Sequence, residues 1–318
     1  MDLSIAVISY NTRDLLLACL QSVQDRTTDV DYELIVVDNA SRDRSVEAVR
    51  ARFPQVTVIA NADNGGYAKA CNQAAAVSSG RYVLLLNSDT VMQAHTLRTM
   101  VTCLDQSPDV GAVSCKQWTG DGQLYQSCFP FPSIRDHLRH AACFQQLAPN
   151  AQAAVAAAHA IDCAQSQDVD WINGACLMVR RDLMEHCGGL DETFFMYFED
   201  VDLCQAIRRR GYRVRHLAEA DIVHLIGRSS ERDRTRLNVE WEFSRIRYVE
   251  KHFPPIKRWI MKFWIAASAV VRLLRMLGCR GSIAQGPPIG AYLSVVQRLW
   301  RVRRANEAPL LFRTEARG

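Results

Sequence analysis

The feature that most constrains this chain of 318 residues is the alternation of short apolar runs with helical patterns over its first 115 residues. The apolar runs are at 4–8, 34–37, 56–60, 82–86 and 110–115. Segments with apolar side chains at helical spacing lie between them, at 13–24, 42–52, 66–79 and 94–106. Strands that alternate with helices in this way form parallel sheets. The order therefore predicts an α/β fold with a doubly wound, mostly parallel sheet.

Polar side chains follow the ends of these runs, where ligands bind in a sheet of this kind. Asp38 ends the second run, and its carboxylate can accept a hydrogen bond from a base N–H or a ribose hydroxyl. The alternative is a turn or a helix cap, a frequent task of Asp at the end of a strand. We expect Ser41 to cap the helix that follows.

A second acid, Asp89, follows the most apolar run in the sequence, YVLLL. A carboxylate there can hold a divalent cation through oxygen ligation, with a diphosphate completing the shell. A helix cap is again the alternative. The turn Asp63-Asn64-Gly65-Gly66 lacks the Lys of a phosphate loop and the spacing of a dinucleotide fingerprint, which excludes both motifs.

Three acids open a helical pattern just after the aromatic run 194–198: Glu199, Asp200 and Asp202. The helix dipole favours acids at this position, which is sufficient to explain one of them. Apolar surroundings would raise the pKa of a carboxylate and suit it to act as a general base. His224 follows a short apolar run, and a single His is more often structural than a ligand.

The net charge of +4 hides an uneven distribution. Residues 251–304 contain eleven Lys or Arg and no acid, and residues 305–318 contain two of each sign. Residues 1–250 therefore hold 38 − 13 = 25 basic and 34 − 2 = 32 acidic residues, a net of −7. We expect a catalytic body at 1–237 and a basic helical extension at 238–318.

The basic extension contains two predicted helices, at 256–277 and 291–304. Within the first of these helices the longest charge-free run, 263–271, is far shorter than the ~20 residues that span a bilayer. Aromatic side chains among Lys and Arg favour a helix lying in an anionic membrane interface. The alternative is a helix packed on its own body with solvated charges. No nucleic-acid motif accompanies the basic residues, so we expect no nucleic-acid partner.

The eleven cysteines contain no CxxC pair and no Cys/His cluster at zinc spacing. The first residues lack the pattern of a secretory signal. Both observations favour a reducing cytosol with free thiols.

In order, the strings SYN, VVDNAS, NGGYAKACN, NSD, WINGACLMVRR, FFMYFEDVDL, RRRGYRV and VH resemble the inverting family-2 glycosyltransferases of the GT-A fold. They are most similar to the bacterial rhamnosyltransferase branch, and the resemblance covers residues 4–230. It implies a nucleotide diphosphate sugar as donor. The residues that it places on the donor side are Ser9, Tyr10, Asn11, Asp38, Asp63, Asn64, Lys69, Asn72, Asn87 and Ser88.

The resemblance also implies a divalent metal, Mg²⁺ or Mn²⁺. Asp89 matches the second acid of the family's DXD motif, and Asn87 replaces the first. One carboxylate fewer makes His224 a candidate for a further metal ligand or phosphate contact. Asp200 matches the catalytic base of a single in-line displacement that inverts the anomeric carbon.

On the acceptor side, the resemblance places Trp171 as a sugar platform, Gly174 for close approach and Glu199 as an orienting or binding group. The expected donor is dTDP-L-rhamnose, with a UDP-sugar or GDP-mannose as alternatives. The expected acceptor is a saccharide, free or polyprenyl-linked, in the synthesis of a bacterial surface polysaccharide. We therefore expect a cytoplasmic protein at the inner face of the membrane. A non-catalytic partner that binds sugar nucleotides is the alternative of another class.

Overall fold

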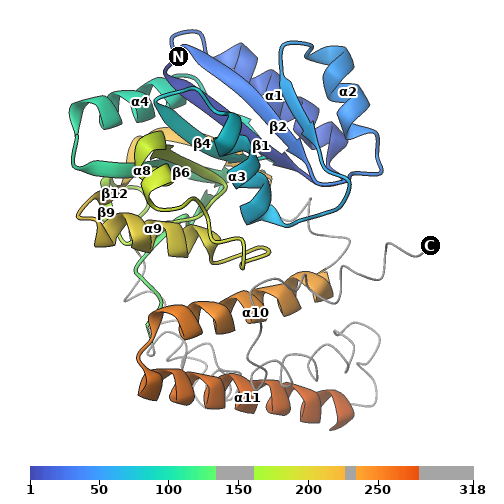
Figure 1. Cartoon of the computed structure of the whole chain (residues 1–318), viewed down its shortest axis with the longest axis vertical. Coiled ribbons are helices and arrows are strands. Elements are labelled where there is room, and N and C mark those ends of the chain that lie inside the picture. Colours follow the sequence, from blue (N-terminus) through green and yellow to red (C-terminus); the bar gives the residue numbers. More distant parts are fainter. Residues whose placement is uncertain (134–160, 226–233, 279–318) are drawn as a thin grey trace. The chain divides into compact units, whose positions relative to one another are not determined.

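The computed structural model describes residues 1–133, 161–225 and 234–278. These residues divide into two compact units. The first holds residues 1–131, 161–192 and 199–225, and the second holds 132–133, 193–198 and 234–278. Figure 1 shows the chain with its elements labelled.

The first unit contains twelve strands and six helices among its described residues. The strands are β1 (Leu3–Ser9), β2 (Tyr32–Asp38), β3 (Thr57–Ala60), β4 (Tyr82–Asn87), β5 (Thr90–Met92), β6 (Val110–Thr119), β7 (Leu124–Tyr125), β8 (Cys128–Phe129), β9 (Gln167–Val169), β10 (Trp171–Ile172), β11 (Cys176–Arg180) and β12 (Arg213–His224). The helices are α1 (Arg13–Arg26), α2 (Ser45–Arg52), α3 (Tyr67–Val77), α4 (Thr96–Gln106), α8 (Arg181–His186) and α9 (Glu199–Arg209).

The main sheet has the order β3-β2-β1-β4-β11-β6-β12-β5, with β7 beside β6 and β9 beside β12. Strands β3, β2, β1 and β4 are mutually parallel. Strand β11 runs antiparallel between β4 and β6, and β12 is parallel to β6. This mostly parallel α/β sheet confirms the predicted fold class. Strands β8 and β10 form a separate two-stranded ribbon.

Each central strand is buried on both faces. Along β1, Leu3, Ile5 and Val7 point into one apolar cluster with α1 and α4, while Ala6 and Ile8 belong to a second cluster with α3 and α9. The continuous apolar runs of the sequence follow from this double burial. Figure 1 shows the helices on both faces of the sheet.

One detail differs from expectation. Helix α2 begins at Ser45 rather than at residue 42, and residue 44 occupies the cap position. Ser41 therefore does not cap the helix; its amide donates to Asp38. The last strand of the main sheet, β12, has an irregular register between Leu217 and Asp221.

In the second unit, α10 (Arg234–His252) and α11 (Pro255–Gly278) pack through Val239, Ile246 and Ile265. The expected helix at 256–277 corresponds to α11, and the one at 291–304 lies outside the described residues. No helix in the described part of the chain is long and apolar enough to cross a membrane.

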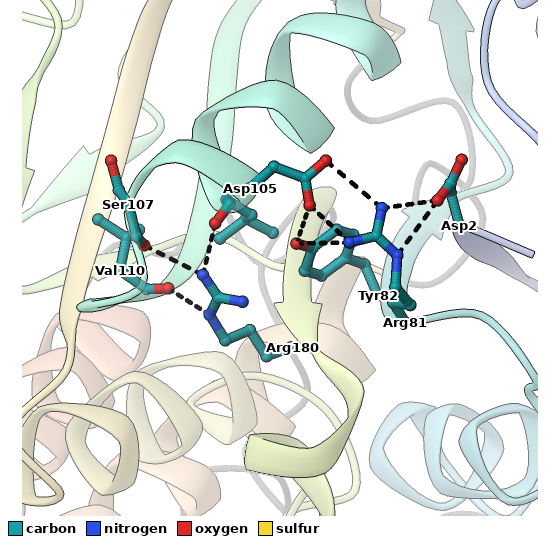
Figure 2. Close-up of polar contacts among 8 residues, drawn as sticks. Asp2, Arg81, Tyr82, Asp105, Ser107, Val110 and Arg180 are labelled. Carbon is teal, nitrogen blue, oxygen red and sulfur yellow. Dashed lines mark hydrogen bonds and ion pairs between the residues drawn. The ribbon is translucent and has the colours of Figure 1, made fainter.

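Two arginines fix the starts of the central strands (Figure 2). Arg81 forms ion pairs of 2.6 Å with both Asp2 and Asp105. Arg180, at the end of β11, donates to the carbonyl oxygens of Leu104, Ser107 and Val110 at 2.5–3.0 Å. These carbonyls close α4 and open β6, so Arg180 joins three elements through their backbones.

Replacing Arg180 with Met removes these three bonds and keeps most of the apolar stem. We expect the free energy of unfolding to fall by about 1–3 kcal/mol, because partly buried carbonyls lose their donor. Urea unfolding followed by circular dichroism measures the change. Arg208→Met is the control: its exposed guanidinium lies 3.7 Å from Asp170, and we expect a change within about 0.5 kcal/mol. Equal midpoints for the two variants would refute the assignment to Arg180.

Candidate active site

The carboxyl ends of β2, β1 and β4 meet at one edge of the sheet. Ser9 lies in register with Asp38, and Ile8 lies in register with Asn87. The predicted donor-side residues at these strand ends are therefore neighbours. Thr12 joins two of the ends, because its hydroxyl lies 3.1 Å from the Ser9 hydroxyl and 2.9 Å from that of Ser88.

The loops after β1 and β2 hold each other in a constrained conformation. Asn11 and Ala40 both have left-handed backbones, with φ of 54° and 64°. The Asn11 amide donates to the Ser41 hydroxyl at 2.8 Å, and the Arg42 amide donates to the Asn11 side-chain oxygen at 2.7 Å. Non-glycine residues with such backbones persist where the surroundings enforce them, often at functional sites.

Asp38 is 2% exposed and offers an unused acceptor. One carboxylate oxygen accepts the Ser41 amide, whereas Oδ2 is buried with no hydrogen-bond partner within the described ranges. Burial raises the pKa of this carboxyl above its usual value. A buried acceptor without a donor suits a ligand N–H or hydroxyl, as expected for a group that contacts a base or ribose.

The turn after β3 is shaped by side-chain bonds to its backbone. The Asn64 side chain accepts the Gly66 amide at 3.0 Å, and the Asn39 side chain donates to the Gly66 carbonyl at 3.1 Å. Gly66 has a φ of 94°, which favours glycine. Asp63 and Lys69 are exposed beside this turn.

Asp89, in the turn between β4 and β5, and His224, at the end of β12, come together although they are 135 positions apart in the sequence. The His224 Nε2 lies 3.3 Å from Asp89 Oδ1, and both residues are buried. On the other side of the ring, Nδ1 lies 3.2 Å from the Gln117 side-chain oxygen. Because an amide oxygen only accepts, Nδ1 carries a proton, which leaves Nε2 as the nitrogen that can bind a cation when the ring is neutral.

This pair fits a divalent cation. Adjacent ligands of an octahedral ion lie about 3 Å apart when each bond is about 2.1 Å, close to the separation of Nε2 and Oδ1. Gln117 is itself oriented by Asn173, to which it donates at 2.6 Å. Outer partners of this kind orient the ring of a histidine that binds a metal.

Asp200 opens α9 with both oxygens engaged by backbone amides. It accepts the Gly174 amide at 2.9 Å and the Val201 amide at 2.8 Å. Burial nevertheless raises the pKa of Asp200 to about 6. Gly174 directly precedes the stretch that pairs with β4: Ala175 accepts the Asn87 amide, and Cys176 is in register with Leu86. Asp200 is thereby held at the same edge as Asn87, Ser88 and Asp89.

The Gly174 carbonyl accepts the Tyr67 hydroxyl at 2.9 Å, so Gly174 bonds to a phenol as well as to a carboxylate. A Cβ added at Gly174 would make ordinary contacts of 3.6 Å with Tyr67 and 3.7 Å with Asp200. Among the protein's own atoms there is therefore room for a side-chain carbon at this position. Glu199 is buried at the start of the same helix as Asp200.

Other predicted residues have bonds that serve the scaffold. The Asn72 side chain donates to the Leu190 carbonyl at 2.9 Å and accepts the Leu190 amide, which fixes a turn before α9. The Trp171 indole donates to the Pro130 carbonyl, and its ring stacks on Phe129 with centroids 4.5 Å apart. Tyr10 is exposed beyond the end of β1.

Sequence reasoning missed Thr12, Gln117, Asn173 and Tyr67. A Gln inside the apolar strand pattern of β6 was a usable signal, because a buried amide requires partners. The hydroxyls of Thr12 and Tyr67 carry no comparable signal, since both residue types are common in surface turns and helices.

The sequence model of the family described as "Glycosyl transferase family 2" matches residues 4–162. The N-acetylglucosaminyl-diphospho-decaprenol L-rhamnosyltransferase of Mycobacterium tuberculosis is 26% identical over 217 residues, which cover 65% of this chain and 70% of that protein. The low-salt glycan biosynthesis hexosyltransferase Agl10 of Haloferax volcanii is 23% identical over 240 residues, which cover 70% of this chain and 67% of that protein.

Solved structures share the fold. The mannosyltransferase PcManGT of Pyrobaculum calidifontis, in complex with GDP-Man and Mn²⁺, superposes with a TM-score of 0.56 at 20% identity and covers 93% of this chain and 79% of its own. TarS 1-349 of S. aureus gives a TM-score of 0.52 at 16% identity and covers 96% and 93%. At these identities the likeness concerns the fold alone.

The network around His224 generates a prediction. Replacing Gln117 with Met removes the acceptor that sets the His224 tautomer, and we expect Mn²⁺ to bind roughly 10–100-fold more weakly. The free Mn²⁺ signal in electron paramagnetic resonance measures binding in the presence of a nucleoside diphosphate. Gln73→Met is the matched control, because Gln73 pairs with Asn61 away from this network. Unchanged Mn²⁺ affinity in the Gln117 variant would show that the amide does not orient the ligand.

Proposed function

This chain belongs to glycosyl transferase family 2, and from that premise we propose that it transfers L-rhamnose from dTDP-L-rhamnose, with inversion, to a saccharide or polyprenyl-linked saccharide. The enzyme is a glycosyltransferase with the GT-A fold, which confirms the family and the class of activity expected from the sequence. The donor, the acceptor, the stereochemistry and the residue roles belong to the proposal.

The observation that carries the mechanism is the environment of Asp200. A carboxylate with a pKa of about 6 is ionised at neutral pH and is basic enough to accept a proton as the acceptor oxygen attacks. Its two bonds to backbone amides fix its direction. The acceptor oxygen forms a bond to the anomeric carbon, the bond from that carbon to the donor diphosphate breaks, and Asp200 takes the hydroxyl proton. One base without a separate nucleophile gives inversion.

Asp38 contacts the donor base or ribose through its buried Oδ2. The nucleotide is surrounded by Ser9, Tyr10, Asn11, Asp63, Asn64 and Lys69. Asp89 and His224 would hold a divalent metal beside Asn87 and Ser88. A bound divalent cation supplies positive charge next to the departing diphosphate. The Mn²⁺ present in the solved mannosyltransferase complex supports a divalent ion, without identifying it as Mg²⁺ or Mn²⁺ in this chain.

The similarity to a rhamnosyltransferase supports rhamnose as the donor sugar. The acceptor-side residues are Trp171, Gly174 and Glu199, of which Gly174 bonds to Asp200 directly. The polyprenyl-linked acceptor is supported by the diphospho-decaprenol in the name of the same relative and by the surface of α11.

Helix α11 carries an exposed apolar stripe. Ile256, Trp259, Ile260 and Phe263 are 76%, 62%, 41% and 67% exposed and recur at helical spacing. Met261 and Ile265 on the other side are buried, and Ile265 packs toward α10. Lys257, on the exposed part of the helix, adds positive charge. An exposed aromatic stripe with basic neighbours supports binding to an anionic membrane interface, where a lipid-linked acceptor resides.

The donor and the base are tested together by the release of nucleoside diphosphate in the presence of a lipid-linked saccharide. We expect release from dTDP-L-rhamnose and little from UDP-sugars or GDP-mannose. Asp200→Asn should lower turnover by about 10²–10⁴-fold while donor binding stays nearly unchanged. Asp182→Asn is the matched control, because its carboxylate likewise accepts the next amide at the start of a helix.

Turnover by the wild-type enzyme should rise with pH through about 6 and then level off, because Asp200 accepts a proton only when it is ionised. Near wild-type turnover of Asp200→Asn would exclude this residue as the base. Release from a different nucleotide class would correct the donor and leave the mechanism intact.

Membrane binding is tested by flotation of the full chain with vesicles that contain or lack phosphatidylglycerol. We expect binding to the anionic vesicles only, weakened by salt. The double substitution Trp259→Ser with Phe263→Ser should reduce binding roughly tenfold or more, because it removes two large apolar anchors. Val77→Ser, at an exposed apolar position of α3, should have no effect. Absence of the wild-type chain from the floated fraction would contradict the proposal.

A further inference from the structure

A second cluster of potential metal ligands lies apart from the residues assigned above. Cys128 begins β8, Cys163 lies in the turn before β9, and His216 lies on β12, all three buried. One ligand atom from each residue lies within 4.8 Å of those of the other two. The cysteines are 35 residues apart, and His216 is 53 residues beyond Cys163, so no zinc spacing is visible in the sequence.

The orientation of His216 leaves one nitrogen unused. Its Nε2 lies 2.9 Å from the Cys163 carbonyl oxygen, which can only accept, so Nε2 carries the proton. The lone pair of the neutral ring is therefore on Nδ1. The His216 ring is fully buried, and Nδ1 has no hydrogen-bond partner among the residues that the structure describes. A ring nitrogen that bonds to a backbone carbonyl while the other faces a cation is the usual arrangement of a histidine ligand.

We propose that Cys128, Cys163 and His216 form a binding site for a zinc-class cation, which two thiolates and one neutral imidazole hold with a fourth, water-derived ligand. Two thiolates balance the two charges of the ion, so the buried site is neutral. Sulfur and imidazole nitrogen are the ligands that zinc prefers, whereas a carboxylate oxygen such as that of Asp89 suits Mg²⁺ or Mn²⁺.

Binding requires a modest movement. The two sulfurs lie 2.6 Å apart, and two thiolates on one tetrahedral zinc lie about 3.8 Å apart. The sulfurs must separate by about 1 Å, and Cys163 lies in a turn while Cys128 belongs to a two-residue strand. A disulfide between the same sulfurs would leave Nδ1 of His216 without a partner, whereas an ion engages all three side chains.

The ion would connect β8 of the β8–β10 ribbon to β12 of the main sheet. Cys128 directly precedes Phe129, which stacks on Trp171 of β10. Gln126 reinforces the same junction by donating to the carbonyls of Cys128 and Ile161. The proposed site thus joins β12 of the main sheet to the two points of the chain that flank residues 129–162.

Cobalt substitution tests the site in the full chain. The protein is purified under reducing conditions, freed of metal with a chelator and titrated with Co²⁺. We expect one equivalent of Co²⁺ to give an intense thiolate-to-cobalt charge-transfer absorption, which added Zn²⁺ abolishes. Cys163→Ser and His216→Gln should each lose or strongly weaken it. Asp89→Ala should retain the absorption, which separates this site from the metal site proposed at Asp89 and His224.

Cys187→Ser is the control for the substitutions, because Cys187 is a half-buried thiol outside the cluster. Thermal melts of each apo variant show whether a lost absorption reflects a lost ligand or a lost fold, and Zn²⁺ should raise the melting temperature of the wild-type chain but not of Cys163→Ser. A titration of thiols after denaturation should find all eleven. Two fewer thiols, or no cobalt absorption from fully reduced and folded protein, would overturn the proposal.

Discussion

Burial of the central strands on both faces is the constraint on which the rest of this structure depends. Strands β2, β1 and β4 are covered by helices above and below, so along most of their length they present only apolar side chains. Their polar residues are confined to the strand ends, and the parallel register brings those ends to one edge. The chemistry is concentrated at this edge because the fold allows polar side chains few other places.

Asp89 and Asp200 both lie at this edge, and their different surroundings suit them to different chemistry. Asp89 lies beside a histidine whose far nitrogen is fixed by Gln117, an arrangement that suits a cation. Asp200 has no positively charged group among the main influences on its pKa, and burial makes it more basic. In the proposed function, these surroundings separate two carboxylates with the same intrinsic chemistry into a metal ligand and a base.

The architecture was predictable from the sequence because double burial leaves a direct record in apolar runs and helical spacing. The strand-end residues Asp38, Asn87 and Asp89 followed from the same pattern. The pairing of Asp89 with His224 could not be derived from it, since it depends on β12 lying beside β5 and β6, a long-range pairing with no local signal. The structural role of Asn72 could not be predicted either, because its partner, the Leu190 carbonyl, is 118 residues away.

The antiparallel insertion of β11 has a mechanical consequence. The strand begins two residues after Gly174, which bonds to Asp200, and ends at Arg180 on the opposite edge of the sheet, where three carbonyls anchor it. A strand moves along its neighbours only in whole residues, and a shift of one residue would turn every side chain of β11 to the wrong face. The register of β11 is therefore fixed. Loss of the Arg180 bonds makes the first unit less stable before it shifts the other end of the strand, next to Gly174 and Asp200. A substitution near Arg180 is thus expected to affect stability, with little effect on the positions of Gly174 and Asp200.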